Sequence, residues 1–335
     1  MVVSRLYDTS MPFTRRLHQA VPTKTSIDTL NFWRGPQQLD NYVATHPEFA
    51  PLAKYPIASW IGDWIANPQQ TVSGYASQAG TKTLLLAVYA IPNRDTGGYS
   101  SGGFADQASY LNWVTSIKNG AGSKSVWYVL EPDALGLASN LSNSAKAERL
   151  DTLSKAVAIL KSGPNAKAYI DCSHWLAPST AADLLISANI AACEGFTLNV
   201  SNFESNASMA SFGESVLVQL VNRGVAGKKY IIDTSRNGNG PLTSAFGTAA
   251  SPWLNAQKEW CNPPGRGAGL SPRTPSDRPN CAAYLYIKMV GESDGNDPGS
   301  TFFSNYYGEN APAAGSFWLK WLQDFMANTN QSNFQ

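Results

Sequence analysis

Residues 84–95 read LLLAVYAIPNRD, and residues 126–133 read VWYVLEPD. Each stretch begins with an apolar run of strand length and ends in charged residues. Five further runs follow this plan, at 57–60, 168–170, 195–200, 230–232 and 284–289. Amphipathic stretches typical of helices lie between them, at 105–118, 144–160, 179–188 and 212–222.

This alternation of apolar strands and helices predicts an α/β fold with a parallel sheet that is covered on both faces. Seven such units favour a closed or nearly closed barrel over an open, doubly wound sheet, which is the alternative. The 335 residues suit one large barrel. We therefore expect residues 1–335 to form a single domain, with no linker or carbohydrate-binding module in this chain.

The composition argues against several classes of function. Lys and Arg number 25 against 24 Asp and Glu, so the chain lacks the positive field that nucleic acid or an anionic membrane would need. No stretch approaches the ~18 apolar residues of a membrane-spanning helix. Three histidines are too few to suggest a zinc cluster. We expect a monomer that needs no metal and no other cofactor.

Cysteine usage and surface composition favour secretion. Four cysteines allow two disulfides in three pairings and fit an oxidising compartment, whereas four unpaired core cysteines are the alternative. Charged residues make up only 15% of the chain, as is common in secreted proteins that meet hydroxyl-rich ligands. The N-terminal MVVSRLYDTSMPF has no apolar signal region. We expect a secreted protein whose signal peptide is absent from this chain.

Polar or aromatic residues follow nearly every predicted strand. In a parallel barrel all carboxyl ends of the strands meet at one rim. Any one of these residues could be a helix N-cap, but seven such strand ends together predict an active site. The predicted rim residues are Trp60, Asp63, Arg94, Asp95, Asp133, Asp171, His174, Trp175, Asn199, Asn202, Asp233, Arg236, Lys288, Glu292 and Asp294.

Crowded carboxylates suit glycoside hydrolysis. Like charges force one carboxyl to keep its proton, which it can donate to a leaving oxygen, while another stays ionised and activates water. Indole rings bind the C–H faces of sugars, and Trp60, Trp175 and Trp260 stand in loop or strand-end contexts. A Ser–His–Asp triad around His174 is disfavoured because no Gly-x-Ser-x-Gly string is present.

Five strings occur in order: AVYAIPNRD, YVLEPDALG, GFTLNVSNF, EWCNPPGRGAG and YIKMVGESDG. Together they resemble glycoside hydrolase family 6, the inverting endoglucanases and cellobiohydrolases. The resemblance covers essentially the whole chain. It implies a distorted barrel of seven parallel strands and a cellulase that hydrolyses the β-1,4-glucosidic bonds of cellulose and cello-oligosaccharides with inversion.

The resemblance also implies roles for individual residues. Asp133 matches the general acid, Asp95 the carboxylate that tunes the acid and positions water, and Asp294 the base. Asp171, Tyr89 and Ser101 (or Ser100) match other groups near the cleavage point, and Trp60, Trp260, Lys288 and Glu292 match sugar-binding positions. The predicted substrate-binding residues further include Asp63, Arg94, His174, Trp175, Asn199, Asn202 and Arg236.

Departures from the family pattern bear on disulfides and on the mode of action. Thr96 stands where many members have a cysteine, and no cysteine follows Gly295. Cys261–Cys281 is then the expected pair, because both flank one long excursion. The compact loop 96–103 favours an open cleft and endo action. The segment 295–318 is long enough to reach across the cleft, so an exo-acting cellobiohydrolase is the alternative.

Two other classes remain open at this point. A non-hydrolytic glucan-binding relative would keep the aromatic residues without catalysis, although the joint presence of Asp95, Asp133 and Asp294 argues against it. A retaining glycosidase acting on another sugar would place its two carboxyl groups about 5 Å apart.

Overall fold

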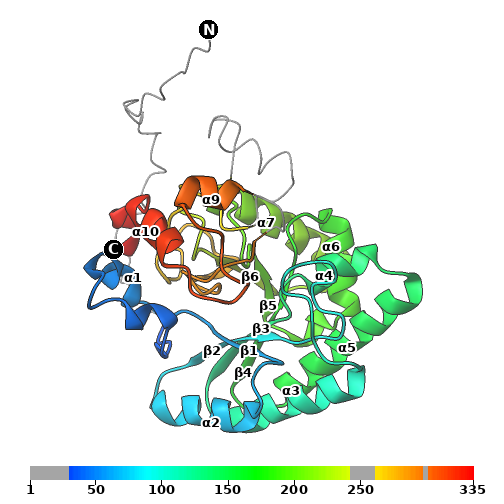
Figure 1. Cartoon of the computed structure of the whole chain (residues 1–335). Coiled ribbons are helices and arrows are strands. Elements are labelled where there is room, and N and C mark those ends of the chain that lie inside the picture. The colour runs from blue at the N-terminus through cyan, green and yellow to red at the C-terminus, as the bar shows by residue number, and fades with distance from the viewer. Residues whose placement is uncertain (1–29, 242–260, 297–300) are drawn as a thin grey trace.

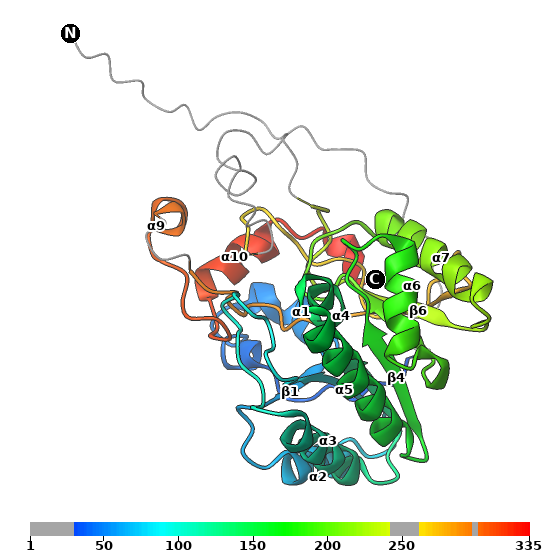
Figure 2. The same cartoon turned by 90° about the vertical axis from the view of Figure 1, so that its right-hand side faces the viewer.

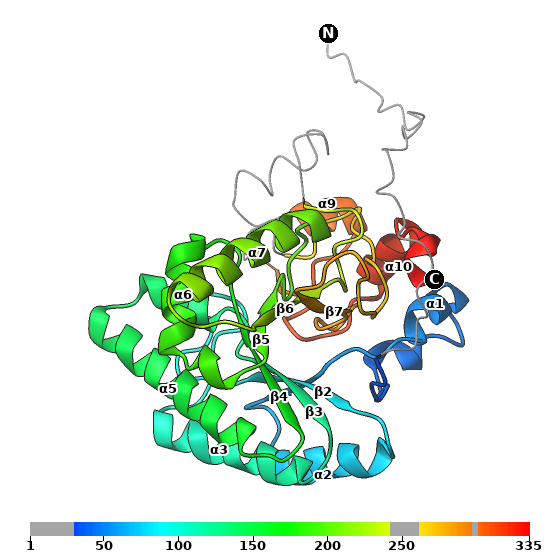
Figure 3. The same cartoon turned by 180° about the vertical axis from the view of Figure 1, so that it is seen from behind.

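A computed structural model of the chain describes residues 30–241, 261–296 and 301–335, and it contains one parallel seven-stranded sheet. The strands pair in sequence order from β1 to β7, and every pair is parallel. They are β1 Ser59–Gly62, β2 Leu84–Tyr89, β3 Val126–Leu130, β4 Ala166–Asp171, β5 Gly195–Leu198, β6 Lys229–Asp233 and β7 Cys281–Leu285. All seven predicted runs are thus confirmed as strands, and Figure 3 shows β2 to β7 from behind.

The last strand begins and ends earlier than the predicted run 284–289. After Leu285 the backbone stops pairing with β6. The N–H groups of Ile287 and Lys288 donate to the Asp233 carboxylate instead of to a strand. The chain therefore turns toward the rim four residues sooner than its apolar pattern indicates.

The sheet curls into a barrel that is only just joined at its seam. One parallel bridge links Ile57, before β1, to Tyr286, after β7, and the Ala58 N–H donates to the Tyr286 carbonyl at 2.9 Å. The Trp60 indole N–H adds a second link to the Ile287 carbonyl at 2.8 Å. The consecutive strand order has no reversal point, so the open doubly wound alternative is wrong.

Long helices cover the outside of the sheet (Figures 1 and 2). These are α2 Pro68–Gln78, α3 Gln107–Ala121, α5 Asn143–Lys161, α6 Pro178–Ser187 and α7 Asn206–Asn222. Several begin at a capping side chain: the Asp106 carboxylate accepts from the Ser109 N–H at 2.8 Å, and Ser142 and Ser205 serve α5 and α7 in the same way. The predicted helices at 105–118, 144–160, 179–188 and 212–222 are confirmed.

Short helices complete the described chain. The α-helical ones are α1 Ala50–Ala53, α4 Ala134–Leu137, α9 Phe302–Tyr307 and α10 Leu319–Ala327. The 3-10 helices are Gln38–Asn41, Pro47–Phe49, Ala138–Asn140, Ile190–Ala192 and Gln331–Phe334. Within the described ranges, none of the helices combines the length and apolarity that a membrane crossing requires.

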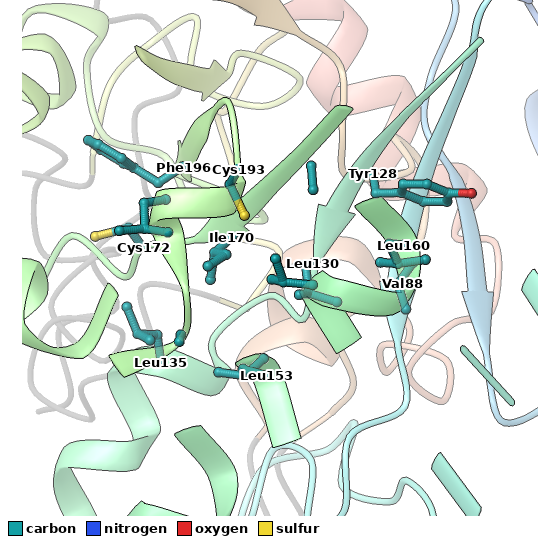
Figure 4. Close-up of a cluster of buried hydrophobic side chains, with 14 of the residues drawn as sticks. Val88, Tyr128, Leu130, Leu135, Leu153, Leu160, Ile170, Cys172, Cys193 and Phe196 are labelled. Atoms are coloured by element: carbon teal, nitrogen blue, oxygen red, sulfur yellow. The ribbon is translucent and has the colours of Figure 1, made fainter. Parts of the chain in front are cut away.

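Alternate residues of each strand enter two different cores, which explains why the strands are apolar throughout. In β2, Leu84, Leu86 and Val88 pack under the helices, whereas Leu85 and Ala87 point into the barrel. Figure 4 shows part of the core between the sheet and the helices. A third cluster gathers around α10. These packed layers fix the strand ends that carry the polar rim.

The cysteine prediction is wrong for the expected pair. Cys281 is a buried free thiol in the core under the helices, whereas Cys261 packs in the cluster around α10. Cys172 and Cys193 are also buried free thiols and lie in the core shown in Figure 4. Placed among apolar neighbours, Cys172, Cys193 and Cys281 act as small hydrophobic groups, which is the common role of an unpaired core cysteine.

Candidate active site

A cleft of about 1090 Å³ opens at the carboxyl ends of the strands. It gathers most of the residues predicted to form the rim. The predicted site residues that line it are Trp60, Tyr89, Arg94, Asp95, Ser101, Asp133, His174, Trp175, Asn202, Arg236, Lys288, Glu292 and Asp294. Asp63, Asp171, Asn199 and Asp233 are not among the lining residues, and Trp260 lies outside the described residues.

The rim is conformationally strained where the key carboxylates stand. Asp95, Glu131 and Asp133 all have a positive φ, of 48°, 49° and 69°. Asn93, Asn199 and Ser201, which also follow strands, share this conformation. Residues with a side chain rarely adopt it, and each instance costs of order 1–3 kcal/mol. The packing of the barrel stabilises this strained backbone, which holds the side chains at the strand ends in fixed orientations.

Asp133 is a cleft carboxyl that holds a proton near neutrality. It follows β3, precedes α4, and is partly buried in the wall of the cleft. Burial, followed by the negative charge of Asp95, raises the pKa of Asp133 to about 7, although the Lys288 ammonium acts in the opposite direction. Asp133 can therefore act as a proton donor.

Asp171 supports Asp133 from behind. It is buried at the end of β4, and its carboxylate accepts from the Asp133 backbone N–H at 2.9 Å and from the Thr197 hydroxyl at 3.0 Å. Burial and the charge of Asp133 raise the pKa of Asp171 well above its usual range. The structure thus places this predicted catalytic residue behind the donor and out of the cleft.

Asp95 lies in a compact loop that follows β2. Arg94 and Gly102 form an antiparallel bridge at the base of this loop, and the Ser100 N–H donates to the Asp95 carboxylate at 2.9 Å. Burial raises the pKa of Asp95, while the Ser100 N–H and the Arg94 charge limit the rise. Asp95 is one of the charges that act on Asp133, so the two carboxyls face a common space.

Gly98 leaves the room in which the Asp95 carboxylate lies. A Cβ on Gly98 would stand 2.2 Å from Asp95 Oδ2, which no real contact allows. We expect Gly98→Ala to displace this carboxylate and to lower kcat by about tenfold or more. The thermal midpoint should barely move, because the loop is at the surface.

The matched control for Gly98→Ala is Gly74→Ala in α2, where a Cβ would meet nothing within 4 Å. Gly74→Ala should leave kcat unchanged. Wild-type kcat in Gly98→Ala would contradict the idea that the Asp95 position matters.

Arg94 holds this loop to the barrel. Its guanidinium donates to Asp63 at 2.7 Å, to the Tyr89 carbonyl at 3.0 Å and to the Ser100 carbonyl at 2.9 Å. It also stacks over the Tyr89 ring, 4.6 Å from the centroid. Asp63 accepts in addition from the Gly103 N–H at 2.9 Å. Asp63, predicted to bind substrate, therefore braces the loop, and its carboxylate is occupied by protein donors.

A network of opposite charges forms the side of the cleft next to β7. Asp294 pairs with Arg236 at 2.6 Å and with Lys288 at 3.2 Å, and Lys288 pairs with Glu292 at 2.6 Å. Burial would raise the pKa of Asp294, but Arg236 and Lys288 outweigh it and lower that pKa. Asp294 is therefore ionised across the mildly acidic to neutral range in which Asp133 keeps its proton, and its basicity is low.

Other predicted site residues fall into two groups. Tyr89 packs edge-on against Trp60, with ring centroids 5.2 Å apart, and burial raises the pKa of its hydroxyl, so it stays neutral. Burial lowers the pKa of His174 to about 4, which keeps this cleft residue neutral as well. Asn199 instead serves the backbone, because its amide bonds the Asp233 carbonyl and both backbone groups of Glu204.

Two buried carboxylates organise the rim: Asp233, which was predicted to lie there, and Glu131, which was missed. Asp233 accepts from the backbone N–H groups of Ser201, Ser235, Ile287 and Lys288, and so ties the ends of β5, β6 and β7 together. Glu131 accepts from the N–H groups of Ala90 and Ile91 and from the Tyr110 hydroxyl. The signal for Glu131 was available, since it directly follows β3.

Ser100, the predicted alternative to Ser101, also lines the cleft. The cleft further contains residues that the sequence patterns did not single out. They are Gln38, Trp64, Gly98, Tyr99, Leu137, Ser201, Phe203, Glu204, Pro241, Met289, Ala314, Gly315 and Ser316. Among the described residues, no group of three or more His, Cys, Asp or Glu side chains has the arrangement of a metal site.

The raised carboxyl pKa values give a testable pH dependence of stability. Burial raises the pKa of Glu131 to about 7, as it does for Asp133. The folded protein keeps these protons where the unfolded chain has lost them, so the free energy of unfolding must fall as pH rises from about 4.5 to 7. The lowered pKa of Asp294 makes the free energy of unfolding rise with pH, but only below the ordinary aspartate pKa of 3.8. Each of these two carboxyls contributes about 2.6 kcal/mol over this range, so we expect a loss of about 5 kcal/mol between pH 5 and pH 8 in urea unfolding.

Glu131→Gln tests the origin of this slope. The variant should be less stable at pH 5, because an amide NH2 group replaces one of the carboxyl oxygens that accept from the Ala90 and Ile91 N–H groups. Its stability should depend less on pH, because the group that titrates has been removed. A slope equal to that of the wild type would assign the effect to other groups.

The comparisons with known proteins agree with this geometry. The family model described as "Glycosyl hydrolases family 6" matches residues 35–329, and the chain belongs to this family. It is 34% identical over 273 residues to "Endoglucanase A" of Cellulomonas fimi, covering 80% of this chain and 53% of that protein. It is 37% identical over 292 residues to "Endoglucanase 1" of Streptomyces sp. (strain KSM-9), covering 82% and 75%. The chain thus spans about half the length of the Cellulomonas protein.

A solved structure matches the fold as a whole. It is the endoglucanase Cel6 from Mycobacterium tuberculosis in complex with methyl-cellobiosyl-4-deoxy-4-thio-β-D-cellobioside, at 33% identity and a TM-score of 0.76. The match covers 90% of this chain and 98% of that one. The curled sheet of seven parallel strands described above is the fold shared with this enzyme.

Proposed function

We propose that the chain is a cellulase that hydrolyses β-1,4-glucosidic bonds of cellulose and cello-oligosaccharides. The observation that carries this proposal is Asp133, a cleft carboxyl whose pKa is raised to about 7 by burial and by the charge of Asp95. Such a group can protonate the leaving glycosidic oxygen at mildly acidic to neutral pH. The names of the Cellulomonas, Streptomyces and Mycobacterium relatives support β-1,4-glucan as the substrate.

The reaction is a single displacement with inversion. Asp133 donates its proton to the leaving oxygen while a water molecule attacks the anomeric carbon from the opposite face. Asp95 keeps the donor protonated, and Asp294 is the candidate base because it is ionised beside the same cleft. Arg236 and Lys288 make Asp294 a weak base. A weak base suffices, since the water becomes acidic only as its bond to carbon forms.

The first-formed anomer tests this mechanism. Proton NMR of a cellotetraose digest should show the α-anomer before mutarotation, which is the product of inversion at a β-linkage. The β-anomer as first product would favour the retaining alternative, and binding without any turnover would favour the non-hydrolytic relative.

We favour endo action, with exo action as the alternative. The loop 96–103 is compact and has no disulfide, while Ala314, Gly315 and Ser316 reach the cleft from the other side. An endo-acting enzyme should produce a large share of new reducing ends in the insoluble fraction of amorphous cellulose. Almost exclusive release of soluble cellobiose would favour the cellobiohydrolase alternative.

We further propose that the chain is one catalytic domain and acts as a secreted monomer. The single continuous sheet and the family match over residues 35–329 support one domain. An insoluble polymer outside the cell is accessible only to a secreted enzyme. Light scattering after gel filtration should give the mass of one chain, about 36.0 kDa.

A further inference from the structure

Trp64 is an exposed indole in the cleft that the proposed reaction does not use. Its side chain is 57% exposed, the largest value among the big apolar side chains of the described residues. It stands two residues after β1 and lines the cleft. Covering apolar surface at such a position with a ligand is favourable, because it removes that surface from water.

The indole ring is held on one face. It folds back over Gly62, where a Cβ would lie 2.2 Å from ring atoms, so only glycine allows this position. The Arg94 guanidinium lies 5.5 Å from the ring centroid, and Asp63 fixes that guanidinium at 2.7 Å. The ring is thus held in place before any ligand binds, which reduces the side-chain conformational entropy lost on binding.

The position of Trp64 relative to the carboxyls suggests its ligand. Trp64 follows β1 and the 48% exposed Trp175 follows β4, whereas Asp95 and Asp133 follow β2 and β3. Since the strands are adjacent in sequence order, the two carboxyls lie between the two exposed indoles. A glucan chain that spans both rings must then pass the proton donor.

Trp64 also lies farther out than Trp60. Trp60 is fixed in the strand through its indole N–H, and it contacts Tyr89 and lies 5.8 Å from the Lys288 ammonium, two groups that interact with Asp133. Arg94 connects Trp64 to Tyr89, because its guanidinium lies 5.5 Å from the Trp64 ring centroid and 4.6 Å from the Tyr89 ring centroid.

We propose that Trp64 is an additional platform that stacks on one glucosyl unit of a β-1,4-glucan chain, one that lies beyond the unit bound at Trp60. The inference rests on the proposed function. Its consequence is a preference for long substrates, because a short oligosaccharide that occupies the positions next to the cleaved bond does not reach this ring.

The test compares Trp64→Ala and Trp64→Tyr with the wild type on cellohexaose and cellotriose. In Trp64→Ala, the ratio of kcat/KM for cellohexaose to that for cellotriose should fall about five- to tenfold, the size expected for one lost stacking contact. Trp64→Tyr should restore most of this ratio, since a phenol ring can still stack. Val221→Ala, at a 55% exposed position on α7 outside the cleft, is the control and should leave the ratio unchanged.

Two results would overturn the platform. An unchanged ratio in Trp64→Ala would mean that no glucosyl unit contacts the ring, and equal losses on both substrates would mean that Trp64 acts only by supporting Arg94. A second measurement tells a failure of the platform from a failure of the proposed function. It is the affinity for cellohexaose, measured by calorimetry with and without Trp64→Ala in the Asp133→Asn variant. Failure of hydrolysis in the wild type would refute the proposed function, whereas weaker binding after Trp64→Ala would still support the platform.

Discussion

Asp133→Asn should lower kcat on cellotetraose by about 10³-fold or more while the affinity for the oligosaccharide stays within a few-fold of the wild type. The amide has nearly the shape of the acid but has no proton to give to the leaving oxygen. The backbone contact to Asp171 uses the Asp133 N–H and is preserved in the variant. Steady-state kinetics and isothermal titration calorimetry measure the two quantities on one preparation.

The wild-type pH profile should reflect the same group. Because the pKa of Asp133 is raised to about 7, kcat should decline as pH rises through this value, where the donor loses its proton. Asp151→Asn is the matched control, since Asp151 is a half-exposed carboxylate on α5 that pairs only with surface groups. A tenfold loss or less in Asp133→Asn, or lost binding in a folded variant, would show that Asp133 is not the donor.

The strands were predictable because each is buried on both faces, which leaves a continuous apolar run in the sequence. Helix boundaries were less clear where burial does not depend on large apolar side chains. Helix α7 begins at Asn206, six residues before the predicted start at 212, because residues 206–211 read NASMAS. Ser205 caps this turn, and only Met209 and Ala210 of it are buried.

The gathering of carboxylates at one rim was predictable from parallel topology, but the direction of each side chain was not. Asp63 and Asn199 follow strands just as Asp95 and Asp133 do, yet their polar atoms are used by Arg94 and by the backbone. For Asn199 that outcome depends on a positive φ of 67°, and for both residues it depends on partners from distant segments, which leave no local pattern. Trp64 was missed for a related reason, because only its contact with Gly62 and Arg94 distinguishes it from an ordinary turn residue.

Asp95→Asn should have the second-largest effect, with kcat lowered by about 10²-fold and both limbs of the pH profile changed. The Asp95 charge raises the pKa of Asp133 next after burial, so its removal must lower that pKa. The decline of kcat at high pH should therefore move to lower pH. The decline of kcat at low pH should weaken. The pKa of Asp95 is raised, so in the wild type this carboxylate gains a proton as the pH falls, and the variant lacks that carboxylate.

The pH profile is the measurement that separates this role from a merely structural one. A variant that only loosens the loop would slow hydrolysis at every pH without moving either limb. Glu292→Gln provides the comparison, because Glu292 is a cleft carboxylate that pairs with Lys288 and is not among the charges that raise the pKa of Asp133. If the high-pH limb shifts in Asp95→Asn but not in Glu292→Gln, the donor is held protonated by one specific neighbour. If neither variant shifts it, burial alone sets the pKa of Asp133, and the assigned role of Asp95 is wrong.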